Sequence, residues 1–463
     1  MAVKLLSFLG TNKYIPCRYE LEGKKSRITH FIQAALVELL LPQFEEEKEV
    51  VVFTTEDAKE KNWEKGQGYE GLKDVLAVLS QEIGFTWKNV VIPEGFSSKE
   101  AVDIFKAVFN TIEEGSKLIF DLTHSFRSLP FLAGLIINYA RLLKGVEVAG
   151  VYYGAFEKLG RTWEVEEKWP DPAKRIAPVV SLNYFLELSD WLLAANIFLQ
   201  AGDARPVADL AEKGFKKISD EKKREERKWR DLARELRNFA GEVATCRTLS
   251  LSGVSREERA PGHGYLWVHH SGTLERVKEK LAELGGERDP ALELFAPVVD
   301  KIRGQFEAYG EDDIDNINHL IRWCLEHGLI MQGYTFLREN IITALCVING
   351  FREYDEDDRE LQGKIATVSA RNLPEERWAP DLKERREEVI RLLTDPDMVA
   401  GYKLLNTVGA YRNDLDHAQF TKNSTTAESF KESLKEHLEQ FAGFYNKHKP
   451  RQRHPYGPPV VVD

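Results

Sequence analysis

The first 155 residues alternate short apolar runs with longer amphipathic segments, and this alternation is what most limits the fold. The runs are nearly continuous in Val, Ile, Leu and Phe, which is typical of strands buried on both faces of a parallel sheet. The segments between them have helical spacing, so the pattern predicts helices on both faces of that sheet. The predicted strands are residues 3–9, 50–53, 90–92, 117–122 and 146–153, and the predicted helices are 28–41, 69–83, 129–143 and one that Ser97 caps.

The remainder of the chain changes to helical periodicity. Residues 252–264 are predicted to form a loop, and the Pro-rich residues 449–463 are predicted to fray. The fold class is therefore α/β plus all-α. The expected parts are a Rossmann-like parallel-sheet domain at 1–178, a helical connector at 179–310 and a helical domain with a flexible tail at 311–463. The predicted helices of the last two parts are 182–200, 274–284, 290–308, 314–330, 332–348, 382–393, 398–410 and 426–447.

Composition restricts the class of protein. No run of about 18 apolar residues occurs, so no membrane span is predicted, and the N-terminal residues lack the pattern of a secretory signal. The four cysteines are far apart and form no C-x-x-C pair, so neither a zinc site nor a disulfide framework is predicted. We therefore expect a cytoplasmic protein without a bound metal.

The formal net charge of −11 argues against a surface that grips duplex nucleic acid along its length. Any contact with RNA should then be a local basic pocket. Residues 222–228 contain several Lys and Arg, but acidic residues alternate with them, so a solvated helix is the simpler interpretation.

Two polar loops follow the first and fourth predicted strands, and both should lie at one edge of the sheet, where such sheets bind ligands. The first contains Gly10, Thr11 and Asn12, and the second is residues 123–130. Backbone N–H groups near the start of the next helix, together with Arg127, would suit an anionic ligand.

The ligand should be neither a dinucleotide cofactor nor a nucleoside triphosphate, because the G-x-G-x-x-G and G-x-x-x-x-G-K-[ST] motifs are absent. A simpler interpretation of the second loop also stands. Thr123 and Ser125 would then only cap the following helix, and His124 would be a surface residue.

The segments 8–12, Phe-Leu-Gly-Thr-Asn, and 121–130, with the pattern D-x-T-H-x-F-R-S-x-P, resemble the CARF sensor domains of CRISPR-associated type III accessory nucleases. The resemblance covers about residues 1–175 and implies a dimer whose two sensor domains bind one cyclic oligoadenylate. It does not decide the ring size, and cyclic tetra-adenylate is favoured over cyclic hexa-adenylate. The implied ligand-binding residues are Gly10, Thr11, Asn12, Thr123, His124, Ser125 and Arg127.

Asp121 ends the fourth predicted strand, and we expect it to orient the second loop rather than to bind the ligand. Some sensors of this kind also cleave their own activator slowly. Thr11, Asn12 and His124 are the candidates for such a ring-nuclease activity here.

Near the C-terminus, Arg412, Asn413 and His417 supply the groups that RNA cleavage by 2′-hydroxyl attack requires. Histidine titrates near neutrality and can move a proton, and arginine offers several donors to a phosphate. On a helix Asn413 and His417 share a face, with Arg412 on its flank. The neighbouring Asp414 and Asp416 are expected to be solvated, or else to hold Arg412 in place.

The R-x-x-x-x-H pattern is weak alone, because residues 322–327 contain a second copy. The Trp, Cys and Leu inside that copy predict the buried face of a core helix, with Arg322 and His327 at its edges.

The segment 412–417 resembles the signature of the HEPN ribonuclease domains that accompany CARF sensors, and 332–339 resembles the core helix that precedes it. The resemblance implies a homodimer with a composite active site, with Arg412, Asn413 and His417 as catalytic residues. It also implies metal-independent cleavage of single-stranded RNA that leaves a 2′,3′-cyclic phosphate and a 5′-hydroxyl. The link to the type III CRISPR effector complex would be functional, without stable binding.

Two other classes of function remain open. A ligand-responsive CARF regulator that binds DNA would carry a basic recognition helix, which the acidic balance disfavours. A CARF-type DNA nuclease would need a cluster of carboxylates and a lysine around a divalent metal, so its activity would be sensitive to EDTA.

Overall fold

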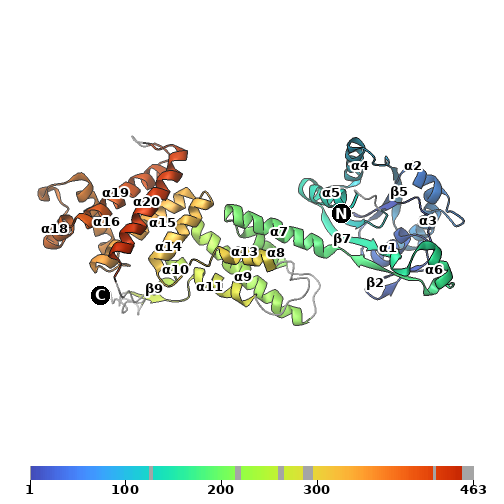
Figure 1. Ribbon diagram of the computed structural model, residues 1–463, viewed down its shortest axis with the longest axis horizontal. Coiled ribbons are helices and arrows are strands. Elements are labelled where there is room, and N and C mark those ends of the chain that lie inside the picture. The colour runs from blue at the N-terminus through green and yellow to red at the C-terminus, as the bar shows by residue number, and fades with distance from the viewer. Residues whose placement is uncertain are drawn as a thin grey trace. The chain divides into compact units, whose positions relative to one another are not determined.

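The chain forms two compact units, Met1–Glu187 and Leu188–Asp463 (Figure 1). The computed structural model describes residues 2–124, 129–213, 220–258, 265–284, 296–420 and 424–450. The predicted division of the helical part at residue 310 stays a prediction, as does the first boundary at residue 178. The tail predicted to fray lies almost wholly outside the described residues.

The first unit is built on an eight-stranded sheet with the order β3-β2-β8-β7-β6-β1-β4-β5. The strands predicted from apolar runs are its five neighbouring parallel strands, β7-β6-β1-β4-β5. The predicted Rossmann-like class is therefore confirmed. The strands are β1(Val3–Leu9), β2(Arg18–Leu21), β3(Lys24–Lys25), β4(Lys48–Thr54), β5(Thr86–Val91), β6(Lys117–Asp121), β7(Glu147–Gly154) and β8(Ile176–Ser181).

Helices cover both faces of the sheet, because every residue of β1 is buried and successive side chains alternate between the faces. Leu5 and Leu9 belong to a core formed with α1 and α3, and Leu6 and Phe8 to a second core formed with α4 and α5. The helices of this unit are α1(Ile32–Leu40), α2(Glu56–Ala58), α3(Leu72–Ile83), α4(Ser98–Thr111), α5(Leu129–Lys144) and α6(Thr162–Lys168), with the shorter turns η1(Leu41–Gln43), η2(Lys59–Glu64), η3(Phe156–Leu159) and η4(Pro172–Lys174).

The sheet is mixed rather than wholly parallel, because β8 runs antiparallel to β7 and β3 antiparallel to β2. The sequence did not predict β8, which contains Pro178, a residue that cannot donate to a neighbouring strand. The carbonyl of Pro178 still accepts from the N–H of Ala155 at 2.9 Å.

The second unit is mainly helical, and most predicted helices are present. One expectation was wrong. Part of the predicted loop at 252–264 is the strand β9(Val254–Glu258), which pairs antiparallel with β10(Tyr265–His269). The sequence also missed α16(Glu356–Arg371). The helices are α7(Asn183–Ala201), α8(Arg205–Lys213), α9(Asp220–Ala244), α10(Thr248–Ser252), α11(Thr273–Glu283), α13(Ala296–Gly304), α14(Asp313–Glu326), α15(Ile330–Asn349), α16, α17(Pro380–Glu384), α18(Arg386–Thr394), α19(Pro396–Asp416) and α20(Ala427–His448), with the turn η5(Glu375–Arg377).

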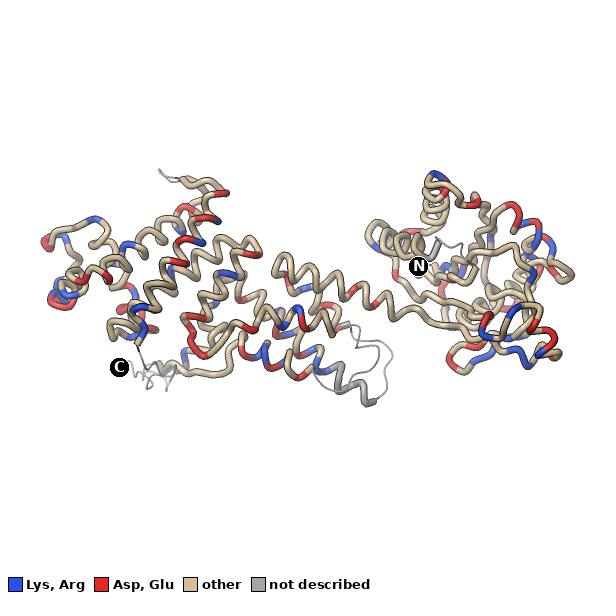
Figure 2. Tube along the Cα trace, in the orientation of Figure 1, with Lys and Arg blue, Asp and Glu red and all other residues tan. Residues whose placement is uncertain are grey.

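One aromatic cluster joins the predicted connector to the helices that follow it. The rings of Phe239 in α9 and Trp323 in α14 lie 5.1 Å apart, and Phe306 lies 5.1 Å from Phe239. All three side chains are buried. Basic and acidic residues are interspersed along both units (Figure 2).

Candidate ligand pocket and candidate nuclease centre

The loop that follows β1 is fixed through its backbone. The N–H of Gly10 donates to the hydroxyl of Tyr14 at 2.9 Å. The buried amide of Asn62 donates to the carbonyls of Gly10 and Asn12 at 2.8 and 2.9 Å. These bonds set the direction of the predicted ligand-binding loop.

Asp121 organises the loop that follows β6. The register places Ser7 beside Asp121, and the Ser7 hydroxyl donates to the Asp121 carboxylate at 2.6 Å. The same carboxylate accepts from the N–H and the hydroxyl of Thr123 at 2.9 and 2.5 Å. Thr123 Oγ1 accepts in turn from the N–H of Gly154 at 2.8 Å. Burial raises the pKa of Asp121, and the hydrogen bonds from Ser7 and Thr123 oppose that shift. The carboxylate therefore has the orienting position predicted for it.

His124 is partly buried rather than a plain surface residue. Its ring lies 4.7 Å from that of Tyr14, centroid to centroid. Nε2 is buried and has no hydrogen-bond partner in the part of the chain that the structure describes. Burial lowers the pKa of His124 to about 4, so the ring is neutral near pH 7. A buried polar atom without a partner is costly, and a ligand could satisfy it.

A cavity of about 510 Å³ lies at the carboxyl ends of β1, β6 and β7. Open α/β sheets bind their ligands at this edge. Of the predicted ligand-binding residues, Asn12, Thr123 and His124 line the cavity. The other lining residues are Lys13, Tyr14, Ile15, Tyr19, His30, Tyr153, Gly154, Phe156, Glu157, Gly160, Arg161, Thr162 and Glu164.

The remaining predicted residues are placed differently. Gly10 and Thr11 are not among the lining residues. A Cβ at Gly10 would lie 3.1 Å from the Tyr14 hydroxyl and 3.7 Å from His124, so a side chain there would require the Tyr14 hydroxyl to shift. Ser125 and Arg127 lie outside the described residues.

The sequence did not predict that residues in and around η3 and α6 line the cavity. Tyr153 donates a short hydrogen bond to Glu157. Burial and the nearby Glu157 carboxylate raise the pKa of Tyr153 to about 12. The N–H of Arg161 donates to Glu164 at 3.3 Å. These residues lie at or after the end of the fifth predicted strand. That position at the ligand-binding edge of the sheet could have identified them, although they form no contiguous motif.

The last turn of α19 brings together Arg412, Asn413 and His417. The N–H of His417 donates to the carbonyl of Asn413 at 3.0 Å, and both side chains are exposed. The guanidinium of Arg412 lies 3.3 Å from the carboxylate of Asp416, so one acidic neighbour holds it, as one of the two interpretations predicted.

The expectation that Asp414 is solvated was wrong. Its side chain is only 4% exposed, and its carboxylate accepts from the N–H of Thr425 at 2.7 Å. Asp414 therefore fixes the segment that leads into α20 instead of facing solvent beside Arg412.

The second R-x-x-x-x-H copy is part of the core, as predicted. Trp323, Cys324 and Leu325 are buried. His327 stacks on Trp323 with 4.0 Å between ring centroids, and its Nδ1 lies 2.7 Å from the Trp323 carbonyl. Arg322 is exposed and bonds to His319 at 3.2 Å.

None of the described helices is long and apolar enough to cross a membrane. Within the described residues, no group of three or more His, Cys, Asp and Glu side chains could hold a metal ion.

Known proteins match the first unit and part of the second. Residues 4–157 match the family model described as CRISPR system endoribonuclease Csx1, CARF domain. Residues 4–157 are thus similar to the CARF domain of that family. The chain is similar to CRISPR-associated protein MJ1674 of Methanocaldococcus jannaschii, with 24% identity over 273 residues. The match covers 58% of this chain and 35% of that relative, so the chain spans about a third of the relative's length.

Proposed function

We propose that this chain is an endoribonuclease of type III CRISPR antiviral defence, which a cyclic oligoadenylate activates. The proposal rests mainly on the cavity at the carboxyl ends of β1, β6 and β7, where a buried His124 nitrogen lacks a partner among the described residues. It is supported by the match of residues 4–157 to the CARF domain of the Csx1 endoribonuclease family.

The cavity offers groups that suit a ring of adenylates. Lys13 and Arg161 can pair with phosphates, and the half-buried ring of His30 can stack on a base. We propose cyclic tetra-adenylate, rather than cyclic hexa-adenylate, as the activator. A slow cleavage of the activator by this same cavity would involve Asn12 and His124, which line it.

The proposed reaction takes place at the exposed end of α19. The ribose 2′-oxygen attacks the adjacent phosphorus, and the bond from phosphorus to the 5′-oxygen breaks. The 2′-hydroxyl loses its proton and the 5′-oxygen gains one, and His417 is the proton carrier. Arg412 stabilises the charge on the phosphorane, and Asn413 positions the phosphate. The products are a 2′,3′-cyclic phosphate and a 5′-hydroxyl, without a metal.

A homodimer would bring two such centres together. The face of α5 supports a second copy, because Phe131, Leu135 and Leu142 lie on one side of the helix and are 73%, 47% and 81% exposed. Ligand binding would favour the arrangement of helical domains in which the paired motifs face each other. The dimer would work in the cytoplasm without stable binding to the effector complex.

A labelled single-stranded RNA tests the proposal directly. The protein is incubated with cyclic tetra-adenylate, cyclic hexa-adenylate or no ligand, each with and without EDTA. We expect cleavage only with an oligoadenylate, no effect of EDTA, and products that end in a cyclic phosphate and a 5′-hydroxyl.

Other outcomes point to the other classes. Cleavage that EDTA abolishes would indicate a metal-dependent nuclease. Intact RNA together with ligand-dependent binding of duplex DNA would indicate a CARF transcription regulator.

A further inference from the structure

An aromatic ring stands in solvent beside the candidate nuclease centre. Phe420 is 94% exposed, the highest value among the large hydrophobic side chains that the structure describes. It follows His417 by three residues. A phenyl ring left in water forgoes the free energy that its burial would provide, so such a ring is a candidate contact for a ligand or partner.

A closed turn holds Phe420 in a fixed place relative to His417. The N–H of Phe420 donates to the His417 carbonyl at 2.9 Å, and the N–H of Ala418 donates to Leu415 at 3.2 Å. Ala418 and Gln419 have φ values of +46° and +74°, left-handed conformations that non-glycine residues rarely adopt. Strain of this kind persists where the surrounding structure imposes it, and it is concentrated at functional sites.

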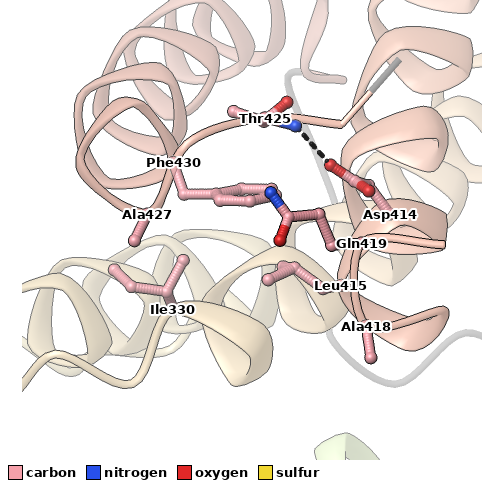
Figure 3. A pocket seen from close by; sticks show the side chains of 8 residues that line it. All are labelled: Ile330, Asp414, Leu415, Ala418, Gln419, Thr425, Ala427 and Phe430. Carbon is pink, nitrogen blue, oxygen red and sulfur yellow. Dashed lines mark hydrogen bonds between the residues drawn. The ribbon is translucent and has the colours of Figure 1, made fainter. Parts of the chain in front are cut away.

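A pocket of about 380 Å³ opens behind the same turn. Its lining combines apolar side chains with the amide of Gln419, which stands between Phe430 and Leu415 (Figure 3). The hydrogen bond from Thr425 to Asp414 closes one wall (Figure 3). The Gln419 amide provides a donor and an acceptor, which is the pair of functions needed to bind the edge of a nucleobase.

We propose that residues 418–420 are the base-binding element of the nuclease centre. Phe420 stacks on an unpaired base of the RNA next to the cleaved phosphate, and Gln419 contacts the edge of a base at the pocket. This inference rests on the proposed function and names how its substrate is bound. Because stacking needs an unpaired base, the element favours single strands over duplexes.

Binding to a labelled single-stranded RNA, measured by fluorescence anisotropy, tests the stacking. All variants carry His417→Ala, so that no RNA is cut. Phe420→Ala should raise the Kd about 10-fold, in keeping with the loss of one stacked base. Phe420→Leu should bind as weakly as Phe420→Ala, because leucine is apolar but has no π face, and Phe420→Trp should restore binding. Phe96→Ala removes a ring that is 87% exposed in the first unit and should leave the Kd unchanged.

Some results would overturn the inference. If Phe420→Ala or Phe420→Leu binds RNA as tightly as the parent protein, the ring does not stack on a base. A shift of Phe420→Ala from dimer to monomer in light scattering would assign the ring to a second copy of the chain instead.

Cleavage by the activated protein separates this inference from the proposed function. If the wild-type chain cuts RNA but the Phe420 series binds equally, only the base-binding element is wrong. If the series behaves as expected while no ligand triggers cleavage, only the proposed catalysis is wrong.

Gln419→Ala, in a chain that retains His417, should change the relative cleavage rates of oligonucleotides that differ in the base beside the cut. Equal rates for that variant and the wild type would remove Gln419 from the element.

Discussion

Polar side chains at the edge of the sheet divide into those that hold the fold and those left for a ligand. The hydroxyl of Thr123 donates to Asp121 and accepts from Gly154, so its only donor is used within the sheet. The neighbouring His124 keeps a buried ring nitrogen without a partner among the described residues. At residue scale, His124 is therefore the stronger candidate for contact with a ligand.

The pKa of His124 gives a prediction about pH. The neutral ring is favoured in the folded protein down to about pH 4, whereas the unfolded chain takes up a proton near pH 6.5. The free energy of unfolding should therefore be highest above pH 6.5 and decrease as the pH falls toward 4, by on the order of 3 kcal/mol.

NMR titration of isotope-labelled histidines provides the measurement. The resonance that disappears in His124→Gln should titrate near pH 4, and the variant should lose less stability than the wild type between pH 7 and 4.5. A His124 resonance that titrates near 6.5 would show that the ring is solvated.

The sequence predicted the contiguous parts of this pocket and missed the rest. Asn12, Thr123 and His124 could be found because each directly follows an apolar strand. Asn62 could not, because its hydrogen bonds to Gly10 and Asn12 arise only when distant segments meet. A ligand role was predicted for Thr11, but its backbone carbonyl accepts a hydrogen bond from the amide of Gln67 at 3.1 Å.

Elements were predictable where burial is complete and not where it is partial. Every residue of β1 is buried, and its apolar run was plain in the sequence. By contrast, β2 has alternating half-buried residues over only four positions, and β8 contains Pro178. The helix α16 begins with three acidic residues, Glu356, Asp357 and Asp358, which hid its apolar face. Short or mixed patterns do not separate a strand or helix from a loop.

The junction between α19 and α20 gives a prediction at the scale of elements. Asp414→Ala would leave the N–H of Thr425 without its acceptor and should destabilise this junction by about 2 kcal/mol. Hydrogen–deuterium exchange at the start of α20 should then become faster.

Asp416→Ala is the matched control for Asp414. It removes an exposed ion pair to Arg412, in which the two side chains are 38% and 37% exposed, and should cost less than about 1 kcal/mol. Equal exchange in both variants would mean that the Asp414 bond does not secure the junction.

The whole molecule joins an α/β unit with a candidate ligand pocket to a helical unit that carries the candidate nuclease centre. Each site has its own chemistry, so substitutions at one should leave binding at the other intact unless the two are energetically coupled. The two copies of the R-x-x-x-x-H pattern allow this to be tested within one unit, because His417 is exposed whereas His327 is half-buried and stacks on Trp323.

His417→Ala should abolish RNA cleavage and leave the affinity for cyclic tetra-adenylate unchanged, because the imidazole is exposed and its removal leaves the helix intact. His327→Ala should instead destabilise the fold without stopping cleavage, because this ring stacks on buried Trp323 and bonds to its carbonyl. Cleavage should persist, and the free energy of unfolding should fall by about 1 kcal/mol. Calorimetric binding of the ligand and a cleavage assay on both variants decide the matter. Cleavage that survives in His417→Ala, or that is lost in a folded His327→Ala, would place the catalytic histidine elsewhere.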